Sequence, residues 1–411
     1  MNAKRTLRTD VVIVGGGMAG LSLACAFGGA GLDCVVIDRE DPATAVDAAF
    51  DGRVSALAHA TCQMFKGLGI WAHVSEAQPI LDIRVSDGDS LLFLHYDHRD
   101  LGDEPFGHMV ENRVTRLALL ARIAELPTVR LLAPAGVTDV RRDAARSEVH
   151  LADGTVVSAP LCVGADGRNS PLRQSAGIKC AAWSYHQVGI VCTVHHELPH
   201  GGVAQERFLP AGPFAILPMT DGPEGEHRSS IVWSERSGLA DALLALDDAR
   251  FLQELEWRFG DFLGTVRPIG PRWCWPVGLV LAERFFAERL ALAGDAACGI
   301  HPIAGQGFNL GIRGVAALAE CAVDAFRLGL DIGGPAVLAE YQRRQRADSV
   351  LLAGITDGLN RLFSNDIAPV QAARQLGLAA VGRLPGLKRA FMRHAMGVAG
   401  APPRLVRGEP L

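Results

Sequence analysis

Three glycines near the start of the chain have the spacing of a phosphate-binding turn. Gly15, Gly17 and Gly20 form a G-x-G-x-x-G pattern. In that pattern the first glycine permits a sharp turn, the second lets the backbone approach a pyrophosphate, and the third lets a helix pack against a strand. The helix then directs the free N–H groups of its N-terminus at the anion.

The elements expected around these glycines indicate the same chemistry. A β-branched run at 11–14 precedes the turn, helix-forming residues follow it, and a second β-branched run ends at Asp38, where a carboxylate can bind an adenosine ribose. The sequence therefore predicts a dinucleotide-binding strand–turn–helix–strand unit. The alternative is a glycine-rich turn in an ordinary α/β protein, and the pattern alone leaves both NAD and FAD open.

A second stretch with chemical potential reads GDAACGIHPIAGQGFNLG, residues 294–311. Asp295 is its one acid, and the glycines that follow lead into a helix expected to begin near Phe308. No lysine stands where a phosphate-binding loop ending in GK[ST] would need one. The stretch suits a backbone that comes very close to a flat or anionic group.

The bulk properties narrow the class of protein. A chain of 411 residues is long enough for two or three domains, and a formal net charge of -5 argues against a general nucleic-acid binder. The cysteines are scattered, odd in number and free of CxxC pairs, so we expect reduced, mostly buried thiols in a cytoplasmic protein, without a zinc site.

One apolar run approaches the length of a membrane span. Residues 11–37 are mostly apolar, but Asp33 and several glycines interrupt them. A spanning helix needs about 20 predominantly apolar residues in succession. We therefore interpret the run as a buried strand, a tight turn and a buried helix.

Several segments together resemble one flavoprotein family. They read DGRVSALAHATCQMFKGLGIW (51–71), LCVGADGRNSPLR (161–173), GPFAILPM (212–219), VWSE (232–235), RLALAGDAACGIHPIAGQGFNLGIRGVAALAE (289–320) and TDGLNRLFSND (356–366). In this order they resemble the FAD-dependent aromatic hydroxylases, the class A flavoprotein monooxygenases, and more narrowly the ubiquinone-biosynthesis hydroxylases. The resemblance implies an α/β fold like that of para-hydroxybenzoate hydroxylase: a Rossmann-like FAD-binding domain, an antiparallel-sheet substrate domain and C-terminal helices.

The resemblance also implies which residues hold the flavin. The Asp295 carboxylate would accept hydrogen bonds from the ribityl hydroxyls, and Pro302 would shape the flavin face where oxygen reacts. Backbone amides along Gly305, Gln306, Gly307 and Asn309 would lie against the isoalloxazine edge and the pyrophosphate. His301 would lie near the same face, although a histidine before a proline is equally consistent with a structural role.

Further cofactor contacts are carried over from the family. Arg53 matches an arginine that contacts the cofactor phosphates, Arg113 begins a helix where the family touches the flavin, and Asp166 belongs to the ADG motif. A solvated loop charge is the alternative for Arg53, and plain helix capping is the alternative for the segment of Arg113. The family commonly reads GDAAH where this chain has Cys298, which puts any catalytic role at that position in doubt.

The expected substrate pocket is apolar. We assign it Phe214, Leu217, Pro218 and Trp233, without an obvious paired arginine for a benzoate carboxylate. We interpret the tryptophans of WCWP, residues 273–276, as core aromatics at a domain junction. The resemblance to the ubiquinone-biosynthesis hydroxylases implies a polyprenylated phenol or quinone precursor as the substrate, and an apolar pocket agrees with it.

The reaction follows from the family. FAD would be reduced by NAD(P)H or another donor, O2 would give a C4a-hydroperoxyflavin, and the ring would be hydroxylated in ubiquinone biosynthesis. No second glycine fingerprint identifies the electron donor. Two alternatives are an FAD-dependent hydroxylase of a soluble aromatic compound and a flavin-dependent prenyl-lipid reductase that inserts no oxygen.

The order of the motifs predicts the domain organisation. The FAD-binding domain would comprise 1–78, 105–181 and 277–345, the substrate domain 79–104 and 182–276, and a C-terminal helical region 346–411. An amphipathic helix is expected at 248–260.

The C-terminal region is basic. From Arg343 onward, eleven basic residues face four acidic ones, and LPGLKRAFMRHAMGVAG mixes basic with apolar side chains. Such a segment can rest on the inner face of an anionic membrane or on a partner protein. The alternative is a helix packed on its own flavin domain. A ubiquinone-biosynthesis assembly, a lipid carrier and a homo-oligomer are all left open as partners.

Overall fold

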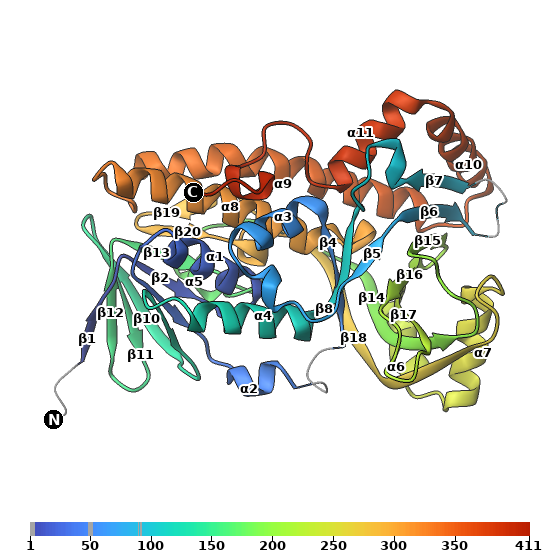
Figure 1. The fold of residues 1–411 in the computed structure, drawn as a ribbon, viewed down its shortest axis with the longest axis horizontal. Coiled ribbons are helices and arrows are strands. Elements are labelled where there is room, and N and C mark those ends of the chain that lie inside the picture. Colours follow the sequence, from blue (N-terminus) through green and yellow to red (C-terminus); the bar gives the residue numbers. More distant parts are fainter. Residues whose placement is uncertain (1–4, 48–51, 89, 91–92) are drawn as a thin grey trace.

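The computed structural model describes residues 5–47, 52–88, 90 and 93–411. Asp51, which opens one of the segments quoted above, lies outside the described residues. The chain forms a sheet-and-helix body at one end and a second body built on a large sheet at the other (Figure 1). The mixed α/β fold with C-terminal helices is confirmed.

A six-stranded sheet organises the first body, in the order β19-β20-β13-β2-β3-β9. Its strands are β2 (Val11–Val14), β3 (Cys34–Ile37), β9 (Val129–Leu132), β13 (Leu161–Gly164), β19 (Phe286–Ala287) and β20 (Leu290–Leu292). All neighbours are parallel except β19 and β20. Every residue of β2, β3, β13 and β20 is buried, because helical crossovers cover parallel sheets on both faces.

The apolar run 11–37 forms β2, the helix α1 (Met18–Gly29) and β3. This confirms the predicted strand–turn–helix–strand unit. Within the described ranges, no helix is both long enough and apolar enough to cross a membrane.

An eight-stranded sheet organises the second body, in the order β21-β18-β14-β17-β16-β15-β6-β7 (Figure 1). Its strands are β6 (Asp82–Asp87), β7 (Phe93–Asp97), β14 (Cys180–His196), β15 (Val203–Leu209), β16 (Gly212–Met219), β17 (His227–Arg236), β18 (Val266–Ala282) and β21 (Cys298–Gly299). The helices α6 (Ser237–Leu244) and α7 (Asp248–Phe259) pack on one face. The amphipathic helix expected at 248–260 is thus confirmed as α7.

Two smaller sheets and three short helices complete these bodies. One sheet has the order β1-β12-β11-β10 and the other β4-β8-β5. Their strands are β1 (Thr6–Arg8), β10 (Val137–Arg142), β11 (Ser147–Leu151), β12 (Val156–Ala159), β4 (Val54–Ala58), β5 (Gln78–Ile80) and β8 (Gly107–Glu111). The short helices are α2 (Pro42–Ala45), α3 (His59–Gly67) and α5 (Pro171–Ser175).

Longer helices connect the two ends of the molecule. The helices α8 (Gln306–Arg327) and α9 (Pro335–Phe363) run side by side along one side of both sheets, and α4 (Asn112–Ala124) packs on α1 (Figure 1). Beyond α9, α10 (Ala368–Arg383) and α11 (Pro385–Ala395) lie over β6 and β7. A buried ion pair between Arg374 Nε and Asp87 Oδ2, at 2.8 Å, fastens α10 to β6.

The cysteines carry free thiols, and most are buried, as expected. Cys180 is exposed and Cys274 is half-buried.

Candidate active site

Three turns meet at one edge of the parallel sheet. The backbone N–H of Gly15 donates to Ile37 at 2.8 Å, that of Ala165 donates to Val14 at 2.8 Å, and that of Ala293 donates to Gly164 at 2.9 Å. These contacts bring together the turns that follow β2, β13 and β20. Ligands of open α/β sheets bind at this edge, outside the carboxyl ends of the strands.

The three fingerprint glycines differ in what the protein itself requires of them. Gly15 has φ +110°, and a Cβ there would lie 2.2 Å from the Ala165 carbonyl oxygen. A Cβ on Gly20 would lie 1.9 Å from the Gly15 oxygen. For Gly17, by contrast, a Cβ would meet nothing within 4 Å in the described part of the chain. The space above Gly17 is therefore free for a ligand.

Gly17 is also the N-cap of α1 and brings no side-chain cap to the helix. Beside it, Asp38 at the end of β3 accepts hydrogen bonds from the backbone N–H of Gly16 and, at 2.8 Å, of Glu40. The carboxylate is thus fixed at the rim of the glycine turn. The uncapped N–H groups of α1 suit a pyrophosphate, and Asp38 stands where a ribose would follow.

Asp295 lies in the turn that follows β20. Its side chain keeps 48% of its surface accessible, and Arg168 Nε lies 4.0 Å from Oδ2. Surrounding protein atoms nevertheless raise the pKa of Asp295 by desolvation, while Arg168 and Arg53 act in the opposite direction. The Asp295 carboxylate is therefore partly desolvated by the protein but still accessible on one side. It can accept hydrogen bonds from the hydroxyls of a bound ligand.

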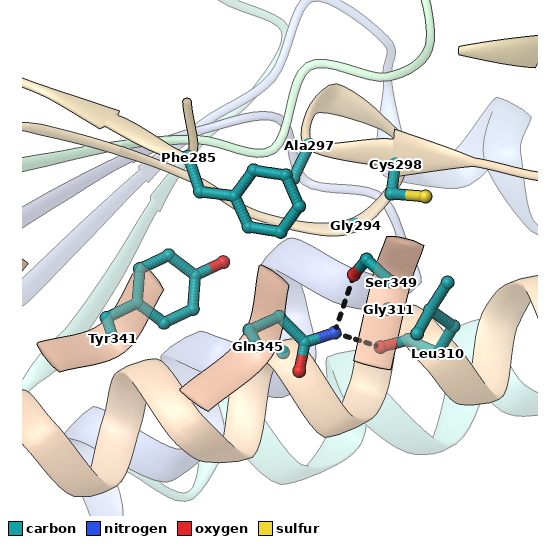
Figure 2. Close-up of a pocket in the computed structure, with 10 residues that line it drawn as sticks. Phe285, Gly294, Ala297, Cys298, Leu310, Gly311, Tyr341, Gln345 and Ser349 are labelled. Atoms are coloured by element: carbon teal, nitrogen blue, oxygen red, sulfur yellow. Dashed lines mark hydrogen bonds between the residues drawn. The ribbon is translucent and has the colours of Figure 1, made fainter. Parts of the chain in front are cut away.

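Behind this turn the structure is closely packed. A small cavity of about 10 Å³, with room for one water molecule at most, is lined by residues of α8, α9 and the 294–298 turn (Figure 2). Gln345 Nε2 donates across it to the Leu310 carbonyl at 3.1 Å and to Ser349 Oγ at 3.3 Å. The cavity therefore supports the Asp295 turn and is too small for a cofactor.

Cys298 lines the same cavity, where the family commonly has a histidine (Figure 2). Its side chain is 3% exposed, and burial raises the pKa of the thiol to about 12. The residue at this position is a neutral core group.

The next turn, Pro302–Gly305, presents backbone to solvent. Pro302, Ala304 and Gly305 are exposed, whereas Ile303 is 2% exposed and anchors the turn. Ala304 and Gly305 have φ +57° and +62°, and Gly305 is the N-cap of α8 without a side-chain cap. The helix begins at Gln306, two residues before the expected Phe308.

Side chains at the start of α8 hold this turn in place. Asn309 Nδ2 donates to the Ala56 carbonyl at 2.7 Å, and its Oδ1 accepts from Ala58 N and Thr61 Oγ1 at 2.9 and 2.8 Å. Gln306 Nε2 donates to the Ala304 carbonyl at 3.3 Å. The Asn309 side chain is therefore used inside the protein, and as the fourth residue of α8 Asn309 also donates its backbone N–H within the helix. The backbone N–H groups of Gln306 and Gly307, in the first turn of α8, are the groups left to a cofactor.

His301 lies beneath the turn rather than on its surface. The ring is 0% exposed, and desolvation lowers its pKa to about 4, so the imidazole is neutral. Nδ1 accepts from Ile303 N at 3.2 Å, which leaves Nε2 to donate to Gln187 Oε1 at 3.3 Å. Asn360 of α9 donates to the same Gln187 oxygen at 3.0 Å. The ring of His301 is thus enclosed by these partners and presents no free nitrogen at the surface of the turn. Its position near the flavin face stays a prediction.

The remaining predicted cofactor residues lie around the same edge. The Arg53 guanidinium stacks on the Trp275 ring at 4.4 Å. Arg113 Nε donates to the Val46 carbonyl at 2.8 Å. Asp166 Oδ2 accepts from Leu172 N at 3.0 Å, and its buried Oδ1 has no hydrogen-bond partner within the described residues. Contact of Arg53, Arg113 and Asp166 with the cofactor stays a prediction.

Strand alternation divides the predicted pocket residues between two faces of the eight-stranded sheet. Phe214 and Trp233 are 0% and 1% exposed and form the core under α7, which we call the outer face. Pro218 lies on that face too, because it is an even number of residues from Phe214. Leu217 lies on the opposite, inner face, where it packs against a cluster that includes Ile80, Phe106 and Met109. Assigning Phe214, Pro218 and Trp233 to the pocket is therefore a mistake, and Leu217 alone remains.

The inner face carries residues that the sequence analysis did not select. Trp275 is 37% exposed and lies under Arg53, so the interpretation of this tryptophan as a core aromatic is wrong. A Cβ on Gly52 would collide with the Trp273 ring. Glu206 accepts a hydrogen bond from the Ala304 N–H at 3.4 Å. The Glu206 hydrogen bond places the inner face against the Pro302–Gly305 turn. Period-2 alternation separates the two faces within β15 and within β18, but the strand pairing that identifies the inner face comes from the structure.

The donor set fits a dinucleotide with a polyhydroxyl chain. Two helices begin at glycines without side-chain caps, an accessible carboxylate lies between them, and Gly17 leaves open space. Within the described ranges, no group of acidic, histidine and cysteine side chains could hold a metal ion. The arrangement can bind a flavin dinucleotide with its ring system near the Pro302–Gly305 turn.

Comparison with known proteins agrees with this site. Residues 8–349 match the family described as FAD binding domain. The ubiquinone hydroxylase UbiL of Rhodospirillum rubrum is 55% identical over 406 residues, which cover 98% of this chain and 93% of that protein. The 3-demethoxyubiquinol 3-hydroxylase of Escherichia coli is 35% identical over 393 residues, covering 95% and 99%.

A solved structure shares the fold. The p-nitrophenol 4-monooxygenase PnpA of Pseudomonas putida superposes with a TM-score of 0.79 at 20% identity, over 97% of this chain and 100% of that one.

Proposed function

Since the chain belongs to the FAD-dependent aromatic hydroxylases, and within them to the ubiquinone-biosynthesis hydroxylases, we propose that it hydroxylates the aromatic ring of a polyprenylated ubiquinone precursor. The observation that carries this proposal is the 55% identity to a ubiquinone hydroxylase along 98% of the chain. The alternatives, a soluble aromatic substrate or reduction without oxygen insertion, have no comparable support.

Each part of the site has a separate task in this reaction. The N-terminus of α1 at Gly17 would hold the pyrophosphate of FAD, Asp295 the ribityl hydroxyls, and the backbone amides at the start of α8 the ring edge. FAD, reduced by NAD(P)H or another donor, supplies the activation of O2. The turn at Pro302 and the inner face exclude water and aim the substrate ring.

The inner face is suited to a prenylated ring. Ala215, Leu217 and Val232 are partly exposed on it, and Trp275 adds an aromatic surface. Apolar side chains of this kind favour burial of a ring and the first units of a polyprenyl tail.

The quinone profile of a deletion strain tests the proposed function. A prenylated precursor lacking one ring hydroxyl should accumulate in the strain, and the wild-type gene should restore ubiquinone. Normal ubiquinone in the deletion strain, with no second hydroxylase covering the step, is the outcome that would overturn the proposal.

We also propose that the C-terminal helices rest on an anionic membrane surface, from which the substrate is taken. Leu384, Leu387 and Phe391 are 53%, 42% and 45% exposed, at spacings that place them on one side of α11. Arg389 and Arg393 are exposed on the same helix. Apolar side chains flanked by cations suit the headgroup region of an anionic bilayer.

Replacing Leu387 and Phe391 together by glutamate should weaken binding to phosphatidylglycerol vesicles by at least about tenfold, because each apolar side chain contributes roughly 1.5–3 kcal/mol when buried. Co-sedimentation measures the effect. The matched control is Leu328→Glu, a substitution of a leucine that is 74% exposed at the end of α8. Equal binding by the double variant and the control would refute the membrane contact.

A further inference from the structure

One acidic side chain of the inner face has no role in the account so far. Glu206 lies on β15, where it pairs with Ala215 of β16 and with Val85 of β6. All three side chains lie on the same side of the sheet because directly paired residues share a face. The carboxyl group therefore lies in an apolar surface that it shares with Leu217.

Glu206 also reaches the turn at the start of α8. Its Oε1 accepts a hydrogen bond from the backbone N–H of Ala304 at 3.4 Å, and Ala304 is exposed between Pro302 and Gly305. The acid thus stands where the substrate sheet meets the turn that faces the cofactor. A ligand on the inner face near this turn would lie within reach of the carboxyl group.

The arginines of the neighbouring strands point to the outer face, and Asp87 of β6, which shares the inner face with Glu206, is paired with a cation. On the same strand, Arg207 points to the outer face and donates to the Arg258 carbonyl at 2.5 Å. Arg84 of β6 alternates with Val85 and so points outward as well.

The helices that pack nearby hold charges in pairs of their own. Arg374 of α10 pairs with Asp87, and Arg361 of α9 pairs with Asp357 at 3.0 Å. Burial raises the pKa of Glu206 to about 7, and the Ala304 hydrogen bond only partly opposes this.

A carboxyl group in such surroundings is unfavourable for the fold unless it has a partner. A phenolic hydroxyl supplies that partner, since it donates to a carboxylate, and a base that titrates near neutral pH can take its proton.

We propose that Glu206 binds the ring hydroxyl of the phenolic substrate and accepts its proton as the ring is oxygenated. The O–H bond of the phenol breaks, the proton moves to a carboxylate oxygen of Glu206, and the electron pair stays on the phenolic oxygen. This step involves no oxidation, and it enriches the ring in electrons for attack on the activated oxygen. The assignment rests on the proposed function, which it deepens by naming the residue that receives the ring hydroxyl.

Binding of two probe compounds to the FAD-loaded protein tests this assignment without turnover. The probes are 4-tert-butylphenol and tert-butylbenzene, which differ only in the hydroxyl group, and perturbation of the flavin absorbance gives the dissociation constants. Because a hydrogen bond to an ionised acceptor is stronger, 4-tert-butylphenol should bind about tenfold more tightly above the Glu206 midpoint than below it. Binding of tert-butylbenzene should not change with pH.

Glu206→Gln should abolish the pH dependence and weaken 4-tert-butylphenol binding about tenfold at high pH. Glu224→Gln, which neutralises an exposed acid of the same body, should behave as wild type. A pH dependence that persists in Glu206→Gln, or that tert-butylbenzene shares, would overturn the assignment. The wild-type protein with the two probes decides the question even if the variant does not fold.

The stability of Glu206→Gln supplies a second readout. Burial raises the Glu206 pKa from 4.5 to about 7 in the folded protein, so folding stability is lost as pH rises through this window. The Gln variant lacks that loss. Its Tm relative to wild type should therefore increase between about pH 4.5 and 7 and stay constant above. A Tm difference that does not change with pH would contradict a buried, titrating Glu206.

Failure of this assignment is distinguishable from failure of the proposed function. Oxygenation of a polyprenylated phenol by a protein that does not discriminate the two probes would refute the role of Glu206 alone. Discrimination of the probes by a protein that oxygenates no prenylated phenol would refute the function and support the phenol site.

Discussion

Valine at position 17 should give a folded protein that binds no FAD. In the structure, a Cβ on Gly17 meets no described atom within 4 Å, and the backbone there has an ordinary φ of -69°. The apo protein therefore accommodates the new side chain, whereas the pyrophosphate would need the same space. We expect a loss of affinity of at least about a thousandfold, since a branched side chain both blocks the site and removes the contact to the N-terminus of α1.

Substitutions at two further glycines serve as controls for Gly17→Val. Gly29→Val changes the other end of α1, where a Cβ also meets no described atom, and should retain full FAD. Gly15→Ala places a Cβ 2.2 Å from the Ala165 oxygen at φ +110° and should prevent folding altogether. Flavin absorbance and thermal unfolding measure both properties. Normal FAD content in Gly17→Val would mean that this turn does not hold the cofactor.

Replacing Asp295 by alanine should weaken FAD binding without weakening the fold. Its carboxylate is 48% accessible, and the protein raises rather than lowers its pKa, so the folded chain does not depend on the charge. Loss of the acceptor leaves ribityl hydroxyls unpaired in a dry site, at a cost of about 1–3 kcal/mol, or roughly 5- to 150-fold in affinity.

Equilibrium titration of the apo protein with FAD measures this change. Asp139→Ala, at an exposed acid on β10, is the control and should bind FAD as wild type. Unchanged affinity in Asp295→Ala would remove the 294–311 stretch from the cofactor site.

Sequence patterns were sufficient to predict the parts of the candidate site that local backbone geometry forms. Gly15, Gly17 and Gly20 lie at a fixed spacing between two β-branched runs. Gly15 and Gly20 are each required by a close backbone contact, within a few residues or across one sheet edge, and Gly17 leaves the space between them open. The turn after β20 was equally readable, since Asp295 is the one acid in a run of small residues. The start of α8 was misplaced by only two residues.

The residues of the inner face could not be predicted from the sequence in the same way. Phe214 and Leu217 look alike in an apolar segment, yet strand alternation places them on opposite faces of the sheet, and only the position of α7 decides which face is core. His301 is enclosed by Gln187 and Asn360, which lie far away in the sequence. The surroundings of Glu206 come from two other strands, β16 and β6, and from the Ala304 turn. These properties arise from tertiary contacts, which one sequence does not display.

Single turnover with labelled oxygen tests the central claim most directly. The FAD-loaded protein, reduced chemically in the absence of air, is mixed with a polyprenylated phenol and ¹⁸O₂, so that the identity of the natural electron donor does not matter. One ¹⁸O atom should appear in a new ring hydroxyl of the product, in an amount that follows the FAD content and is absent with Gly17→Val. Reoxidation of the flavin with an unlabelled ring, or with a reduced prenyl lipid as product, would contradict the assignment as an aromatic hydroxylase.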